Sequence, residues 1–312
     1  TDIYARALNV NAGLYANELT TVLGQNNIDV KDQTAPKVNA VNGQSYAQTA
    51  KPDFALDVAQ LGGMYAGKIF LVGTETGLGV HNTGSINAAE NQLTLNANGD
   101  LVNTGNIIAN KDQIAIQAHN VANSGNISST KSKIKVDAAD IQNSGLIATS
   151  DELKLNAQVK INNDTGVMNA GRIDLSAQNL SNAKGQIQQT GQQELNLTAK
   201  KLDNSQGVIG QASKNNTPGN QTDTTAPPIT NPEQNSSAQD SSLITVVEPV
   251  DLTLKTFDAG QIQIVQDIHN VSGQILNNAD IGLKVEGSII NNSGAIQLPE
   301  LQFNGQSFEN QD

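Results

Sequence analysis

Short runs in which apolar and polar residues alternate recur along the middle of the chain. The clearest runs are Leu93-Thr94-Leu95, Ile114-Ala115-Ile116, Ile134-Lys135-Val136, Leu153-Lys154-Leu155, Ile173-Asp174-Leu175 and Leu195-Asn196-Leu197. Alternation places the apolar residues of each run on one face of a β-strand and the polar residue on the other. No stretch shows the 3.6-residue spacing of an amphipathic helix. The pattern therefore predicts a chain of short strands.

Turns rich in Asn and Gly separate these runs and repeat with the same period of about 20 residues. The tight turns place one residue between the Asn and the Gly, and they contain the pairs Asn82 and Gly84, Asn103 and Gly105, Asn123 and Gly125, and Asn143 and Gly145. Looser turns run from Asn163 to Gly166, Asn182 to Gly185, Asn204 to Gly207 and Asn270 to Gly273, and a final turn is read from Asn292 to Gly294.

A repeat of this size with strands and no helices predicts a parallel β-helix. One repeat buries too little apolar surface to fold alone, whereas stacked coils cover each other's inward residues and pair their backbones. Asn and Gly suit the corners because both tolerate the left-handed backbone region that a sharp bend requires. Asn side chains at equivalent corners are also expected to hydrogen-bond to the Asn above and below, as amide ladders do. We predict such a corner ladder at Asn82, Asn103, Asn123, Asn143 and Asn292.

The rhythm of the pattern predicts four segments. Residues 1–80 contain strand-like runs with a loop or short hairpin at 31–52, where the pattern is lost. Residues 81–210 hold the regular repeats. Residues 211–242 are a polar loop rich in Ser, Thr, Asn, Gln and Pro, or a linker, since such a composition buries little surface. Residues 243–312 resume the coils, and the tail from Leu298 is predicted to cover the last of them.

Composition and charge narrow the function. Apolar residues make up 37% and aromatic residues 3% of the 312 residues, which favours an elongated stack over a compact enzyme. The net charge of −12 argues against binding to nucleic acid. The absence of cysteine excludes a disulfide scaffold. Because Thr1 opens close to a strand-like run, we expect the chain to be a segment of a longer protein.

Catalytic and metal-binding patterns were sought and are weak. The three histidines, His81, His119 and His269, are far apart and are interpreted as solvated turn residues. Carboxylate pairs occur, such as Asp137 with Asp140 and Asp151 with Glu152. The outward positions of the alternating runs are mixed, however, so a polysaccharide hydrolase or lyase is a minor alternative. No calcium repeat is present, and the glycines from Leu61 to Gly67 lack phosphate-loop spacing. We expect no enzyme activity, cofactor or metal.

One stretch carries a family resemblance. The residues ALDVAQLGGMYAGKIFLVGTETGLGVHNTGSI, from Ala55 to Ile86, resemble the junction between the secretion domain and the first haemagglutinin repeats of filamentous-haemagglutinin-like exoproteins. Residues Thr1 to Leu19 resemble the preceding coil. The resemblance covers roughly two thirds of the chain by the repeat pattern. It implies a right-handed parallel β-helix, secreted to the cell surface through an outer-membrane partner pore that acts on an N-terminal part absent here.

The resemblance includes large adhesins and contact-dependent growth-inhibition effectors of the two-partner secretion family. We therefore expect a structural or adhesive stalk segment, monomeric and extracellular, that acts in adhesion or presents a distal toxin. The alternative is a carbohydrate- or receptor-binding module that makes its contacts through the loops at 31–52 and 212–242, because loops vary without breaking a solenoid core. The sequence does not identify a receptor.

Overall fold

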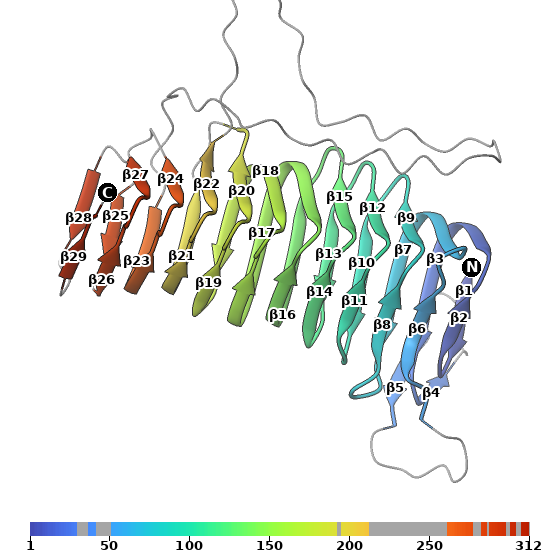
Figure 1. Cartoon of the computed structure of the whole chain (residues 1–312). Coiled ribbons are helices and arrows are strands. Elements are labelled where there is room, and N and C mark those ends of the chain that lie inside the picture. Colours follow the sequence, from blue (N-terminus) through green and yellow to red (C-terminus); the bar gives the residue numbers. More distant parts are fainter. Residues whose placement is uncertain are drawn as a thin grey trace, which may run out of the picture.

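The computed structural model is an elongated stack of β-coils (Figure 1). The structure describes residues 1–29, 37–41, 51–191, 195–211, 261–276, 282–285, 287–297, 300–303 and 307–311. Among these residues, twenty-seven strands join in one sheet, and every pairing within it is parallel. No helix occurs among the described residues. The prediction of an all-β parallel β-helix is confirmed.

Each coil contributes a strand to each of three faces, which the pairing registers define. Face 1 consists of β9 (Ser85–Ala88), β12 (Asn106–Ala109), β15 (Asn126–Ser129), β20 (Gln186–Gln189), β22 (Val208–Gln211), β24 (Gln274–Leu276) and β27 (Ala295–Gln297). Face 2 consists of β1 (Asp2–Ala5), β10 (Leu93–Ala97), β13 (Ile114–Gln117), β25 (Gly282–Val285) and β28 (Glu300–Phe303). Face 3 consists of β2 (Leu8–Val10), β6 (Phe54–Val58), β8 (Gly79–Asn82), β11 (Leu101–Asn103), β14 (Asn120–Asn123), β19 (Asn179–Ser181), β26 (Ser288–Ile290) and β29 (Ser307–Glu309).

Longer strands bend around the corners and belong to two faces or more. They are β3 (Gly13–Leu23), β7 (Gly63–Gly73), β16 (Ile134–Asn143), β17 (Leu146–Asn162), β18 (Val167–Ser176), β21 (Asn196–Asp203) and β23 (Gln261–His269). For example, β17 pairs with β15 on face 1, with the start of β16 on face 2 and with β19 on face 3. The corners therefore need few residues without strand geometry.

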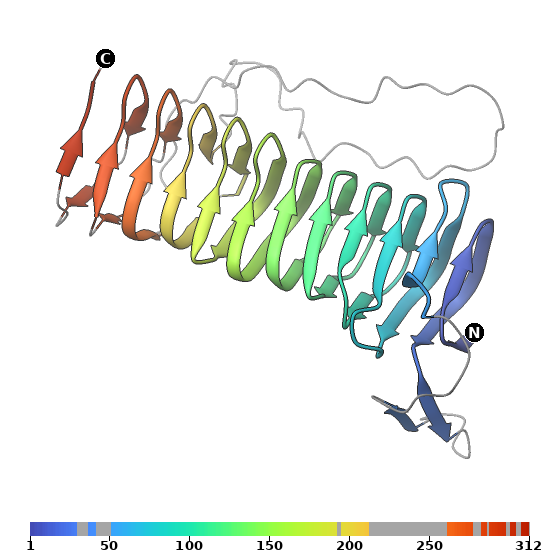
Figure 2. The same cartoon turned by 60° about the horizontal axis from the view of Figure 1, so that its bottom comes forward.

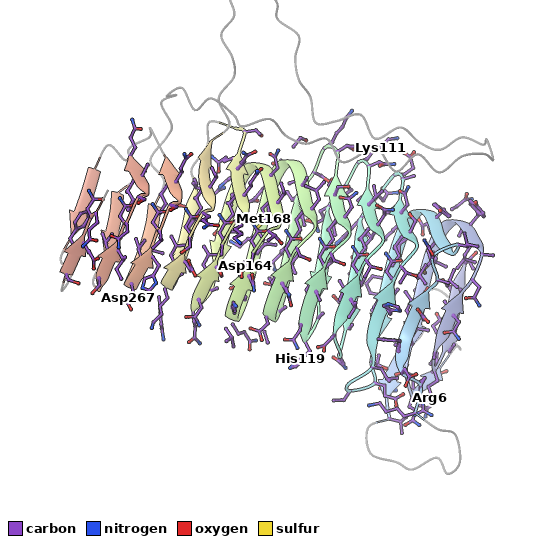
Figure 3. All side chains as sticks on the ribbon, in the orientation of Figure 1. Arg6, Lys111, His119, Asp164, Met168 and Asp267 are labelled. Atoms are coloured by element: carbon purple, nitrogen blue, oxygen red, sulfur yellow. The ribbon has the colours of Figure 1, made fainter. Side chains whose placement is uncertain are left out.

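The core is a set of columns in which each coil places the same kind of side chain above the last. On face 1, the innermost column is almost entirely Ile or Met, with Met64, Ile86, Ile107, Ile127, Ile147, Met168, Ile187, Ile209 and Ile275 all fully buried. Figure 3 shows Met168 within the rod, whereas Lys111, His119 and Asp267 lie at its edges. Each such side chain contributes about 1.5–3 kcal/mol on burial. This stacking makes each coil depend on its neighbours.

The inside and outside assignment of the alternating runs is confirmed on face 2. The inward residues of those runs are no more than 2% exposed. The residues predicted to point outward align in one column, in the order Thr94, Ala115, Lys135, Lys154, Asp174 and Asn196. Alternation therefore continues without a register slip through these coils.

A hairpin departs from the stack near its N-terminal end. Strands β4 (Asn26–Asp29) and β5 (Lys37–Ala40) pair antiparallel and project from the rod (Figure 2). At its base, Arg6 donates two hydrogen bonds to Glu75, from Nε at 3.1 Å and Nη2 at 2.9 Å. The Gln25 backbone N–H donates to the same carboxylate at 3.1 Å. These contacts fix the point where the hairpin leaves β3.

The Arg6–Glu75 ion pair predicts a pH-dependent stability. The Arg6 guanidinium lowers the pKa of Glu75 below its ordinary value. Since the folded-state pKa is the lower one, the pair stabilises the fold above the unfolded pKa, and this contribution is lost as pH falls through the folded pKa. We expect Glu75→Gln to lower the melting temperature at pH 7 and to have progressively less effect toward pH 3. Glu90→Gln, whose carboxylate is 57% exposed beside Lys111, is the control with little effect at either pH. A melting difference at Glu75 that did not change with pH would contradict this role.

The coils continue on both sides of residues 212–260, which lie outside the described residues. Strand β23 pairs with β21, and β24 pairs with β22. In the tail, β28 and β29 pair with β25 and β26 as a further coil. The prediction that the tail covers the stack stays a prediction. The segment boundaries at 80, 210 and 242 remain predictions.

Candidate functional site

The most ordered polar feature of the molecule is a ladder of Asn side chains at the corner between faces 3 and 1. In each link, Nδ2 of one Asn donates to Oδ1 of the next at 2.7–2.9 Å. The members in order are Asn82, Asn103, Asn123, Asn143, Asn163, Asn182, Asn204, Asn270, Asn291 and Asn310. All but Asn310 are buried. The ladder runs through the interior along the length of the repeats.

Each ladder amide also ties its own corner to the next coil. Asn143, for example, donates to the carbonyl oxygens of Gly145 at 3.2 Å and Val167 at 3.3 Å, in addition to Asn163 Oδ1 at 2.7 Å. Its own Oδ1 accepts from Asn123 Nδ2 at 2.7 Å. Burying an amide without partners costs free energy, and here the partners are supplied by the repeat itself. The position is inward-facing, so a shorter or apolar side chain could not bridge the coils in this way.

The corner glycines are required by close backbone approach, which corrects the sequence-based reason. None of Gly84, Gly105, Gly125 or Gly145 has a positive φ. A Cβ at Gly125 would instead lie 2.1 Å from the Gly105 carbonyl oxygen, and one at Gly145 would lie 2.2 Å from that of Gly125. Such distances are far below any van der Waals contact. The glycines therefore allow successive corners to stack directly on one another.

The looser turns form a second class of corner, and this class explains one wrong residue assignment. In each of them the residue just before the Gly has a positive φ, at Thr165, Lys184, Gln206, Ser272 and Ser293. The last corner belongs to this class and runs from Asn291 to Gly294. Asn291 is therefore the ladder member, and the predicted Asn292 is not. Its side chain points away and donates to Glu309 Oε1 at 3.2 Å. Because Asn291 and Asn292 are adjacent, the sequence alone did not show which of the two begins the turn.

The ladder has a defined N-terminal limit. Val58 occupies the position that precedes Asn82 in the column, so no amide is available there. Asn82 Oδ1 is buried and has no hydrogen-bond partner among the described residues. The change from Val to Asn occurs within the stretch that resembles the junction between the secretion domain and the repeats. The interior of this corner therefore changes from an apolar side chain to an amide between the coil of β6 and the coil of β8.

The histidines do not gather, but two of them pair with Asp. His81 lies within β8 rather than in a turn, with Nδ1 2.9 Å from Asp57 Oδ1 and its ring stacked on Phe54. His119 lies 2.9 Å from Asp100 Oδ1 at an exposed edge. His269 ends β23 and is exposed. The interpretation of His81 and His269 as turn residues is therefore wrong, because both belong to the outward column of face 3.

One residue of each acidic pair singled out from the sequence, Asp137 and Glu152, makes an ion pair with basic neighbours on face 2. Asp137 Oδ2 lies 2.9 Å from Lys135 Nζ. Glu152 lies 3.0 Å from Lys133 Nζ and 3.4 Å from Arg172 Nη1. Within the described ranges, no group of three His, Asp or Glu side chains is placed to hold a metal ion. The described residues also include no apolar helix long enough to span a membrane.

Comparison with known proteins agrees with this architecture. A segment of 116 residues is 47% identical to Toxin CdiA of Yersinia pestis, covering 37% of this chain and 3% of that protein. A segment of 104 residues is 46% identical to tRNA nuclease CdiA-2 of Burkholderia pseudomallei, covering 33% of this chain and 3% of that protein. A third relative, tRNA nuclease CdiA of Yersinia mollaretii, is 37% identical over 125 residues, which are 38% of this chain and 4% of the relative. No family model and no solved structure matches the chain.

Fold and corner together define a β-solenoid of the haemagglutinin-repeat type. The resemblance to filamentous-haemagglutinin-like exoproteins is confirmed by homologues named CdiA, which are 37–47% identical over about a third of the chain. The chain spans only about 3% of the length of the curated relatives it matches. About a third of the chain is thus similar to a short segment of these CdiA proteins.

Proposed function

We propose that this chain is a spacer in the stalk of a secreted, cell-surface exoprotein and that it holds a distal toxin away from the producing cell. The observation that carries the proposal is the continuous Asn ladder, which links coil to coil through the interior. In a solenoid each coil contacts only its neighbours, so adding coils lengthens the rod. Such a spacer needs no catalytic or binding site of its own. Relatives named as toxins support toxin presentation over adhesion alone.

The nuclease names of some relatives describe proteins of which this chain matches only a few per cent. We assign that chemistry to other parts of such a protein, because Asp137, Glu152 and Asp174 are each held in an ion pair with a lysine. The proposal further includes secretion through an outer-membrane partner pore and a monomeric state. The net charge of −12 does not favour nucleic acid as a partner of this segment.

Deletion of one whole coil tests the spacer role. Removing residues 104–123 joins Asn103 directly to Ser124 and preserves the corner, because Asn103 and Asn123 are 20 residues apart in consecutive coils. We expect this variant to melt cooperatively near the wild-type temperature. We also expect a full-length parent protein that carries the deletion to inhibit target cells normally. Removing residues 104–113 is the matched control, which breaks the register and should unfold the surrounding coils. Loss of inhibition with the folded whole-coil deletion would contradict a spacer role.

A second candidate, receptor binding through an excursion, is favoured by the projecting β4–β5 hairpin and its anchoring by Arg6 and Glu75. The paired strands β4 and β5 leave the rod at a fixed point, and projecting loops are where binding residues concentrate. Replacing residues 30–36 with a short Gly-Ser linker would separate the two candidates. Unchanged attachment to target cells would contradict receptor binding by the hairpin and leave the spacer as the remaining candidate. Lost attachment with an unchanged melting curve would support receptor binding.

A further inference from the structure

Face 1 differs from the rest of the surface because its strands carry no charge. In the described strands of this face, from β9 through β22, every residue is Ser, Asn, Gln, Thr, Gly or apolar. Only the first four residues of the long strands β17 and β18 belong to it. The outward columns are Ser85, Asn106, Asn126, Leu146, Val167, Gln186 and Val208, and Asn87, Ile108, Ser128, Ala148, Asn169, Gln188 and Gly210.

The other two faces show that this neutrality is not a general property of the coils. Face 2 presents Lys135, Lys154 and Asp174, with Lys154 Nζ 2.9 Å from Asp174 Oδ2. Face 3 presents Asp140 and Lys160 in adjacent register. Charged side chains thus cover two sides of a chain whose net charge is −12. On face 1 they are confined to the turns that border it, such as that of Lys111 (Figure 3).

The outer surface of face 1 repeats along the rod. Amide, hydroxyl and aliphatic side chains are mixed along both outward columns, and successive positions are separated by the spacing of neighbouring parallel strands, about 4.8 Å. Asn106 is exposed, while Ser85, Ile108 and Leu146 are half-buried and lie close to the sheet. Amides and hydroxyls both donate and accept hydrogen bonds without charge. This arrangement suits a long ligand that is itself neutral, rich in hydroxyl groups and repeated at a similar interval.

An aromatic groove lies at the N-terminal end of the same face. Tyr15 and Tyr65 precede Asn87 in one outward column, and their rings stack with centroids 5.2 Å apart. Each ring lies over a glycine two residues earlier: a Cβ at Gly63 would be 2.4 Å from Tyr65 Cε2. The glycine thereby lets the ring lie flat on its strand, with Tyr15 75% exposed.

The groove beside these rings has a volume of about 880 Å³ and is lined by Tyr15, Tyr65, Asn17, Glu18, Asn87 and Glu90 among others. Gly67 contributes no side chain to its floor, and Glu90 is neutralised by Lys111. Aromatic walls with a few hydrogen-bonding groups are typical of small-molecule sites. The C–H faces of a pyranose ring are apolar enough to pack on a tyrosine ring.

We propose that face 1 and the Tyr15–Tyr65 groove form one binding surface for a neutral, extended polysaccharide whose chain runs along the rod. The sugar spacing of a straight β-1,4-linked chain is close to the rise of one coil, so successive sugars meet neutral side chains of successive coils. The strands of face 1 carry no charge, so along them the hydroxyls of the polysaccharide need not displace tightly hydrated ions; Glu18 and Glu90 lie only at the groove. A second copy of this chain is the less favoured occupant, because two copies would each bring a net charge of −12 to the contact.

Retention on microcrystalline cellulose tests this proposal, with polygalacturonate as the anionic counterpart. We expect the wild-type chain to bind cellulose and not polygalacturonate. The double variant Asn106→Lys, Asn126→Lys places charge on outward positions of face 1 and should weaken binding about tenfold, equivalent to about 1.4 kcal/mol. Ala115→Lys, an outward change on face 2, is the matched control and should bind as wild type. Tyr65→Ala should weaken binding similarly, whereas Tyr65→Phe, which keeps the ring, should largely retain it.

The melting temperature of every variant is measured first, so that a folding defect at Tyr65 is not mistaken for lost binding. The lysine double variant keeps the test decisive because its positions lie outside the core. Failure of the wild type to bind cellulose, equal binding of the double variant, or equal retention on polygalacturonate would each overturn the proposal. So would a wild-type dimer in sedimentation that the double variant dissolves without any cellulose binding, since face 1 would then be an interface between copies.

Discussion

Replacing Leu155 with Asp is expected to unfold the coils around it. Leu155 is fully buried and pairs with Val136 in one neighbouring coil and Leu175 in the other. An uncompensated buried charge costs about 3–5 kcal/mol, which is a large part of the 5–15 kcal/mol that stabilises a typical domain. Because each coil is covered by its neighbours, the defect spreads along the stack. Thermal and urea unfolding followed by circular dichroism would measure the loss.

The matched control for Leu155→Asp is Lys135→Ser, on the same face but pointing outward. Lys135 is exposed and contacts Asp137 in an exposed ion pair, so its replacement should cost no more than about 0.5 kcal/mol. Ile134→Asp, immediately beside it in the chain, should behave like Leu155→Asp because Ile134 is fully buried. Equal melting temperatures for the inward and outward variants would contradict the assignment of inside and outside.

Replacing Asn143 should break the ladder at its centre. In Asn143→Ala, the two N–H groups that three acceptors share and one accepted bond are lost, which leaves Asn163 Oδ1 and Asn123 Nδ2 without their ladder partner inside the protein. An unsatisfied buried polar group costs about 1–3 kcal/mol. Because two links of the ladder are broken, we expect the free energy of unfolding to fall by about 2–4 kcal/mol. Gln142→Ala, one residue earlier and pointing outward, should change stability by less than about 0.5 kcal/mol.

The nearly isosteric change Asn143→Asp separates hydrogen bonding from packing. The carboxylate would face the Asn163, Gly145 and Val167 oxygens that now accept from the amide. At neutral pH this places an unpaired charge in the interior, so the variant should be at least as unstable as Asn143→Ala. Acidification protonates the carboxyl and restores one donor, so the defect should shrink as pH falls. A variant as stable as wild type at pH 7 would show that the ladder contributes little.

The period and the alternation were enough to predict the fold because they are local and repeat many times. Runs such as Leu93-Thr94-Leu95 indicate which side chains point inward, and the coils must stack in order to bury these side chains. The ladder could be expected at the tight corners, where Asn143 and Gly145 have a constant spacing. At the last corner, two adjacent asparagines made the register ambiguous, and only the positive φ of Ser293 shows which one turns inward.

Other features depend on distance in space and could not be predicted. Arg6 and Glu75 are 69 residues apart in the sequence, and only the return of the chain to the same corner brings them together. Pairing of His81 with Asp57 likewise follows from the register of β6 with β8. The sequence also could not show why the corners need glycine, because the atom that a Cβ at Gly125 would meet belongs to the neighbouring coil. The neutral face becomes visible once strands from many coils are aligned.

Small-angle X-ray scattering of the purified chain tests the central claim most directly. A rod of stacked coils predicts a scattering curve with a constant cross-section and a pair-distance distribution that is skewed, with its maximum at short distances and a long tail. Deletion of residues 104–123 should shorten the rod by about 4.8 Å, the separation of neighbouring strands, without changing the cross-section. A symmetric distance distribution typical of a compact globule, or a cross-section that changed with the deletion, would contradict the stacked-coil spacer.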